Sequence, residues 1–90
     1  MNDWSNLKAR LEEHQPFPAL YMFKFILNSD NKKIAQVEAL FNEDNTAEIT
    51  IRQSNRGRYV SITVKQMVNT VEEIIHIYEM ASAIPGVMIL

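Results

Sequence analysis

The spacing of apolar residues changes several times along the chain, and each change predicts a new element of structure. Near the N-terminus, Trp4, Leu7 and Leu11 stand three and four residues apart. This is the spacing of one stripe on an amphipathic helix. Asn2 or Asp3 would cap that helix, because short polar side chains accept hydrogen bonds from the first free backbone N–H groups.

After Pro16 and Pro18 the apolar residues alternate with a period of two. The two prolines disfavour helical backbone at and before their own positions. Residues 19–28, "ALYMFKFILN", therefore predict a strand. Both of its faces are mostly apolar, which is typical of a central strand with cover on part of its second face. One face would carry Tyr21, Phe23, Phe25 and Leu27, and the other Leu20, Met22, Lys24 and Ile26.

A helical period returns in "SDNKKIAQVEALFNED". Ser29 or Asp30 would be its N-cap, and Asn42 lies near its expected end. The stripe consists of Ile34, Val37, Leu40 and Phe41.

Two alternating segments follow, and each predicts a strand with one buried and one solvent-exposed face. In the first, Ala47, Ile49 and Ile51 alternate with Glu48, Thr50 and Arg52. In the second, Val60, Ile62 and Val64 alternate with Tyr59, Ser61, Thr63 and Lys65.

The last third of the chain predicts another helix and a short strand. Asn69 with Glu72 and Thr70 with Glu73 both have the spacing of a capping box. Pro85 and the glycine after it end the helix, and "VMIL" reads as a closing strand. The expected inward stripe is Val71, Ile74, Ile75, Tyr78 and Ala81.

After the N-terminal helix the predicted order is strand, helix, strand, strand, helix, strand. Short connections and right-handed crossovers favour one α+β architecture for this order, the ferredoxin-like βαββαβ sandwich. Two helices would cover one face of a four-stranded antiparallel sheet. The predicted core consists of Phe23, Phe25, Val37, Phe41, Ile49, Ile51, Val60, Ile62, Val64, Ile74 and Tyr78.

Composition narrows the class of protein. Ninety residues with 47% hydrophobic content correspond to one globular domain. The formal net charge of −2 gives no general attraction to nucleic acid. The chain has no cysteine, which excludes disulfides and thiolate chemistry. With no signal-like or membrane-spanning run of apolar residues, we expect a cytoplasmic protein with no membrane association.

The segment "SNRGR" at residues 54–58 has two interpretations. Asn55 and Gly57 adopt positive φ readily and lie between two alternating runs, so the segment predicts a hairpin turn. RNA-recognition motifs carry a basic residue, glycine and aromatic residues in the same strand. Here Arg58, Val60 and Thr63 occupy the positions where that motif has its aromatic rings, so RNA binding through the open sheet face is only the alternative prediction.

Several residues near this turn could still bind an anionic ligand or an acidic partner. A single glycine before a strand does not form a phosphate-binding loop, which needs converging backbone amides. The residues that we predict for an interface or ligand face are Lys24, Arg52, Arg56, Arg58, Tyr59, Ser61 and Thr63.

The sequence shows no catalytic or metal-binding constellation. His14 precedes a proline-rich segment and His76 falls on the outer side of the last helix, without metal-ligand spacing between them. Ser54 and Ser61 have no nucleophile-elbow context. We therefore expect a protein that is not an enzyme and that uses no metal and no cofactor.

One face of the predicted sheet would expose a large apolar patch. Leu20, Met22, Ile26 and Tyr59 share the face away from the helices if Phe23 points toward them. Patches of this kind are usually covered. The N-terminal helix could fold over the patch, within the chain or swapped to a second copy, or two sheets could pack face to face. We expect a homodimer.

Three segments carry a family resemblance. They are "FP" at 17–18 with "FK" at 23–24, "QSNRGRYVSITV" at 53–64, and "VEEIIHIYEMASAIPGVMIL" at 71–90. In these segments the chain resembles the YbeD-like family of small bacterial proteins, a domain of unknown function. The resemblance divides the chain into an N-terminal helix, 1–15, and a YbeD-like ferredoxin-like domain, 16–90.

The resemblance also implies a function class. The fold of that family is similar to ACT regulatory domains, which bind amino acids or pair with enzymes. It therefore implies a small regulatory or binding module that acts through a protein partner or a small ligand. Nucleic acid is not the expected partner.

Overall fold

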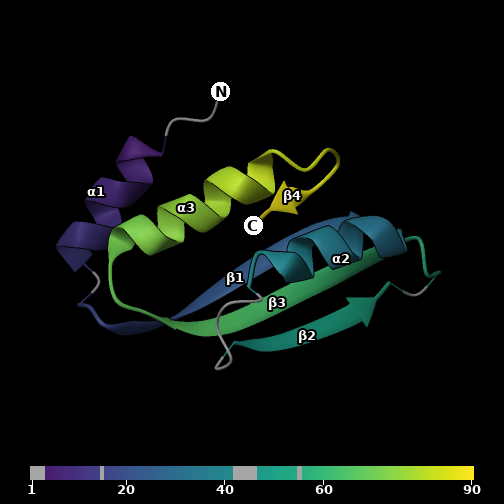
Figure 1. The fold of residues 1–90 in the computed structure, drawn as a ribbon, viewed down its shortest axis with the longest axis horizontal. Helices are drawn as coiled ribbons and strands as arrows, with labels where there is room; N and C mark the ends of the chain where they lie inside the picture. The colour runs from purple at the N-terminus through teal and green to yellow at the C-terminus, as the bar shows by residue number, and fades with distance from the viewer. Residues whose placement is uncertain (1–3, 15, 42–46, 55) are drawn as a thin grey trace.

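The structure, a computed structural model, describes residues 4–14, 16–41, 47–54 and 56–90 of the chain (Figure 1). The predicted caps Asn2 and Asp3, the helix end at Asn42 and the turn residue Asn55 lie outside these residues. The elements are α1 (Ser5–His14), β1 (Ala19–Asn28), α2 (Asn31–Ala39), β2 (Glu48–Gln53), β3 (Tyr59–Val68), α3 (Val71–Ser82) and β4 (Met88–Ile89).

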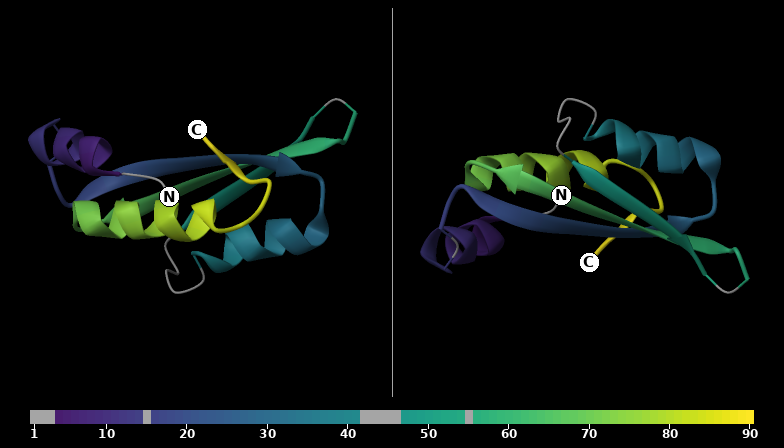
Figure 2. Two further views of the ribbon diagram at one scale, coloured as in Figure 1. Left: turned by 90° about the horizontal axis from the view of Figure 1, so that it is seen from above. Right: turned by 90° about the horizontal axis from the view of Figure 1, so that it is seen from below.

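The four strands form one antiparallel sheet in the order β2-β3-β1-β4. Helices α2 and α3 lie on the same face of the sheet, as Figure 2 shows. This is the predicted ferredoxin-like sandwich with an additional N-terminal helix. The long central strands β1 and β3 pair along ten positions, which explains why both of them need apolar residues.

The core lies between the sheet and the helical layer. Phe23 and Phe25 are fully buried. The centroid of the Phe23 ring lies 5.3 Å from that of Phe41, which follows α2, and 5.6 Å from that of Tyr78 on α3. Full burial of such a side chain stabilises the fold by about 1.5–3 kcal/mol relative to its exposure. The other side chains with less than 2% exposure are Leu27, Val37, Val60, Ile62, Val64, Val68, Ile74 and Ala81.

The prediction that Ile49 and Ile51 belong to the core is wrong. They lie opposite Val64 and Ile62 and therefore face the helices, yet they are 36% and 41% exposed. The physical reason is their place in the sheet. Strand β2 is an edge strand, and α2 and α3 pack over β1 and β3 instead (Figure 1).

The predicted stripe of α3 needs one correction. Ile77 is buried, with 8% exposure, whereas the predicted Ile75 is only half-buried. Four of the five predicted residues do face the core, and Ile77 takes the place of Ile75. The buried stripe is therefore rotated around the helix relative to the prediction, because the apolar residues of α3 extend beyond one stripe and packing selects among them.

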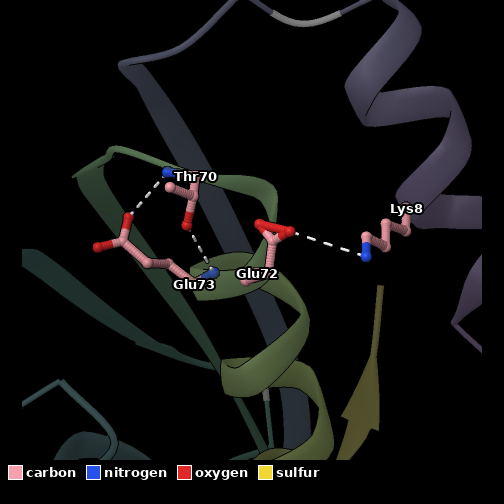
Figure 3. A network of polar contacts seen from close by, with 4 residues as sticks. All are labelled: Lys8, Thr70, Glu72 and Glu73. Carbon is pink, nitrogen blue, oxygen red and sulfur yellow. Dashed lines mark hydrogen bonds and ion pairs between the residues drawn. The ribbon is translucent and has the colours of Figure 1, made fainter.

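Both core helices begin at side-chain caps. The Asp30 carboxylate accepts a hydrogen bond from the Lys32 N–H at 2.9 Å. At α3, Thr70 Oγ1 accepts from the Glu73 N–H, and the Glu73 carboxylate accepts from the Thr70 N–H at 3.2 Å (Figure 3). This is the capping box that the Thr70 to Glu73 spacing predicts.

Helix α1 packs beside α3, at the end where α3 begins (Figure 1). The Trp4 ring stacks on Tyr78 with 5.3 Å between centroids, and Leu7 and Leu11 also contact the core. Lys8 Nζ lies 3.7 Å from a carboxylate oxygen of Glu72 (Figure 3). The apolar stripe of α1 is therefore confirmed, and its partner is the helical layer.

Candidate functional site

The face of the sheet opposite α2 and α3 is the candidate site, and we call it the open face. Its side chains are the alternate residues of each strand, which the pairing register aligns across the sheet. On β1 they are Leu20, Met22, Lys24, Ile26 and Asn28; on β3 Tyr59, Ser61, Thr63, Lys65 and Met67; on β2 Glu48, Thr50 and Arg52; and on β4 Met88.

Helix α1 leaves this face uncovered. Leu20 and Met22 are 64% and 54% exposed, although they belong to the central strand that follows α1. The hypothesis that α1 folds over the sheet within the same chain is therefore wrong. The aromatic ring of Tyr78 provides α1 with a stacking partner for Trp4 in the helical layer instead.

The open face divides into an apolar side and a polar side. The apolar side follows β1 and β4, where Ile26 lies opposite Met88 and Leu20 lies opposite Met67 of β3. Lys24 interrupts this side between Met22 and Ile26. The polar side follows the remainder of β3 and β2, where Thr63 lies opposite Thr50 and Ser61 opposite Arg52. We call the apolar side, Leu20, Met22, Ile26, Met67 and Met88, the apolar strip.

The predicted interface residues are only partly brought together. Lys24, Ser61 and Thr63 lie on the open face near its centre, with Lys24 directly opposite Thr63 and Ser61 opposite Ile26. Arg52 lies on the open face at the edge strand, and Tyr59 lies there at the start of β3. Arg56 and Arg58 are exposed in the hairpin connection, outside the strands.

Sequence reasoning missed three exposed apolar residues, Met67, Met88 and Leu90, with 49%, 59% and 61% exposure. Met67 continues the alternation of β3 two residues beyond Lys65, so the period of the strand was a sufficient signal. Met88 and Leu90 had no such signal, because only the pairing of β4 with β1 decides their face.

The hairpin turn explains the glycine of "SNRGR" without a ligand. The Ser54 N–H donates to the Tyr59 carbonyl at 2.8 Å, and the Gly57 N–H donates to the Ser54 carbonyl at 2.9 Å. Gly57 has φ +68°, and a Cβ atom there would have no neighbour within 4 Å. The glycine therefore serves the backbone conformation of the turn.

The one strongly shifted titratable group among the described residues lies away from the open face. Burial raises the pKa of Tyr78, and the hydrogen bond with Tyr21, 2.8 Å between the hydroxyl oxygens, raises it further. A phenol held protonated in this way is a structural hydrogen-bond partner. It is a poor general base at neutral pH.

Metal-ligating side chains do not gather in the part of the chain that the structure describes, where no three His, Asp or Glu residues form a group. His14 and His76 are both exposed, as predicted. The open face itself offers aliphatic side chains, hydroxyl groups and cations.

A hollow lies on the helix side of the sheet, between the end of α2, α3 and β3, with a volume of about 740 Å³. Its lining combines apolar side chains such as Leu40 and Met80 with the polar groups of Asn69, Glu73 and His76. Gln66 also lines it, and the Gln66 Oε1 atom is buried without a hydrogen-bond partner among the described residues.

A family model described as "Protein of unknown function (DUF493)" matches residues 12–90. The chain therefore belongs to the DUF493 family, which is the family of the YbeD-like proteins. The match begins inside α1, so most of that helix precedes the family domain.

Among solved structures, the chain is similar to the uncharacterised protein TM1266 from Thermotoga maritima. The two share 14% sequence identity with a TM-score of 0.65, over 79% of this chain and 90% of that one. At this identity the likeness supports the fold alone. A comparison with curated proteins finds no match.

No helix in the described ranges has the length and apolar character needed to cross a membrane.

Proposed function

We propose that this protein is a non-enzymatic binding module that acts through a protein partner on its open face. The observation that carries the proposal is the exposed apolar strip. Leu20, Met22, Met67 and Met88 are each about half or more exposed, and they lie together on one face. Exposed apolar side chains gathered on one face in this way are typical of an interaction site.

The composition of the face supports recognition of a macromolecule. Lys24 lies within the strip, between Met22 and Ile26 on β1. Beside the strip, on β3 and β2, lie Lys65, Thr63, Ser61 and Arg52, which resemble the polar rim of a protein interface. A sheet face is broad and flat, whereas small ligands are held in concave pockets. The open face therefore suits a protein partner better than an amino acid.

The proposal includes a regulatory role of the ACT-like kind and a cytoplasmic location. The similarity of the ferredoxin-like fold to ACT domains supports the regulatory role. The absence of cysteine from the sequence is compatible with the cytoplasmic location. A homodimer formed by two open faces would also bury the apolar strip, and this arrangement stays a prediction.

Co-purification with interface variants tests the proposal. The full chain and its Leu20→Glu/Met22→Glu variant would be expressed with an affinity tag in host cells. We expect macromolecules retained by the wild-type protein to be lost from the variant, because carboxylates would be placed within the apolar strip. A matched control, Gln36→Glu/Lys32→Glu, introduces two carboxylates on exposed positions of α2.

Retention by the open-face variant at the wild-type level would contradict the proposal. Loss from the α2 control and not from the open-face variant would assign binding to the helical layer instead. The substituted positions are exposed, so we expect all three proteins to fold. Circular dichroism of each protein checks this.

A further inference from the structure

We infer that the occupant of the open face is an acidic amphipathic helix of another protein. The inference rests on the proposed function and names the chemistry of the partner. It combines three observations on the open face: the dimensions of the apolar strip, its methionine content and the charge around it.

The apolar strip has the dimensions of a short helix. Leu20 and Ile26 lie six residues apart on β1, which corresponds to about 20 Å at the rise of a β-strand. A helix of about 13 residues has this length. Such a helix would place apolar residues at spacings of three and four against the strip, as helices do when they bind to apolar surfaces.

Methionine side chains dominate the strip. Met22, Met67 and Met88 are three of the five methionines in the chain, and all three are exposed on the open face. Methionine has an unbranched, polarisable side chain that adapts to different neighbours, and it is frequent on surfaces that bind amphipathic helices.

The charges on and near the open face are predominantly positive, although the net charge of the whole chain is −2. On the described strands and hairpin connection the only acidic residue is Glu48. The basic residues there are Lys24, Arg52, Arg56, Arg58 and Lys65. The described helices and their caps carry more acidic than basic residues, so the positive charge belongs to the sheet side of the molecule.

This charge distribution favours an acidic partner over a second copy of the chain. Two open faces packed about a twofold axis would bring Lys24 and Lys65 of both copies into one interface, because an isologous interface uses the same patch twice. Like charges at an interface are destabilising. A second copy that offered its more acidic helical layer would form a head-to-tail contact, which continues into an open array unless its rotation closes a ring.

The aliphatic character of the strip favours protein over single-stranded RNA. RNA-binding sheets stack bases on several aromatic rings. Among the described residues of the open face, Tyr59 is the one aromatic side chain, and it lies at the start of β3, away from Leu20 and Met22. The other rings of the sheet, such as Phe23, point into the core.

Site-specific photo-crosslinking tests the inference. The full chain would carry benzoylphenylalanine in place of Met22 and be irradiated in host cells, with the same replacement of the exposed α2 residue Gln36 as the control. We expect a crosslinked peptide from another protein that is rich in Asp and Glu and has apolar residues three and four positions apart.

The double variant Lys24→Glu with Lys65→Glu, made in the same benzoylphenylalanine-bearing protein, tests whether the positive charge of the open face attracts the partner. We expect this reversal to lower the crosslinking yield at Met22 about tenfold, because two attractive contacts become repulsive. The matched control, Lys32→Glu with Lys33→Glu on α2, reverses two charges in the helical layer and should leave the yield within about twofold.

Two outcomes would overturn the inference and leave the proposed function intact: a crosslink to a second copy of this chain, or a crosslink to a protein segment without the acidic amphipathic pattern. A yield that does not respond to Lys24→Glu with Lys65→Glu would also overturn the inference alone. A crosslink to RNA would overturn both the inference and the proposed protein partner. A yield at Met22 no higher than that at Gln36 would overturn both proposals.

Discussion

The hydroxyl groups of Tyr21 and Tyr78 lie 2.8 Å apart and join the central strand β1 to helix α3. Tyr78 also stacks on Trp4 of α1 and contacts the Phe23 ring edge to face. One side chain of α3 therefore connects the N-terminal helix, the sheet and the core. Burial and the Tyr21 hydrogen bond both raise the pKa of Tyr78.

Replacement of Tyr78 by Phe should lower the free energy of unfolding by about 0.5–1.5 kcal/mol, because the Tyr21 hydroxyl loses its partner. Urea unfolding at neutral pH measures the change. Tyr59→Phe is the matched control, since Tyr59 is 52% exposed and should stay within about 0.5 kcal/mol of the wild type. Equal effects of the two variants would show that the Tyr21 contact contributes nothing.

The same tyrosine predicts a pH dependence. The pKa of Tyr78 is higher in the folded than in the unfolded state, so the folded state keeps its proton at a pH where the unfolded state begins to lose it. Stability from this group is complete below the unfolded pKa of about 10 and declines as the pH rises above it. Urea unfolding at about pH 9 and about pH 11 should show a smaller decline in Tyr78→Phe.

Ile62 and Ile51 lie directly opposite each other on β3 and β2, but only Ile62 is fully buried. Ile62→Ala should therefore cost about 2–5 kcal/mol, and Ile51→Ala less than about 1.5 kcal/mol. Chemical denaturation of both variants provides the comparison. Similar losses would mean that the edge strand is covered in solution, for example by a second molecule.

Gly57 should tolerate asparagine better than alanine. Its φ of +68° disfavours a side chain, although the space around it is open. We expect Gly57→Ala to cost about 1 kcal/mol, and Gly57→Asn less, because asparagine adopts this conformation more readily. Thermal unfolding of both variants checks the order, and a larger loss for Asn would count against a purely conformational role.

The capping box at α3 should contribute measurably to stability. Thr70→Ala removes the oxygen that accepts from the Glu73 N–H and should cost about 1 kcal/mol. Thr50→Ala, at an exposed position of β2, is the control and should cost much less. If the two substitutions prove equivalent in denaturant titrations, the cap has no stabilising role.

Much of this fold could be predicted from the sequence because periodicity reports which side of an element is buried. The apolar runs predict β1 at its observed bounds, and Thr70 with Glu73 predicts the start of α3. The order of elements then leaves the ferredoxin-like sandwich as the favoured topology. Gly57 likewise identifies the hairpin turn, since the backbone conformation there depends on local residues alone.

The period of a strand does not show how far the helices extend over the sheet. Which residues of the sheet the helices bury was decided only by the tertiary structure. Ile49 and Ile51 follow the core pattern, yet they stay exposed because the helices lie over the central strands. The stripe of α1 does not specify its partner, which proved to be Tyr78. Met88 joins the open face through the pairing of β4 with β1, a contact between distant parts of the chain. Burial of a side chain depends on neighbours brought together by folding, whereas the period of a strand or helix is a property of its own residues.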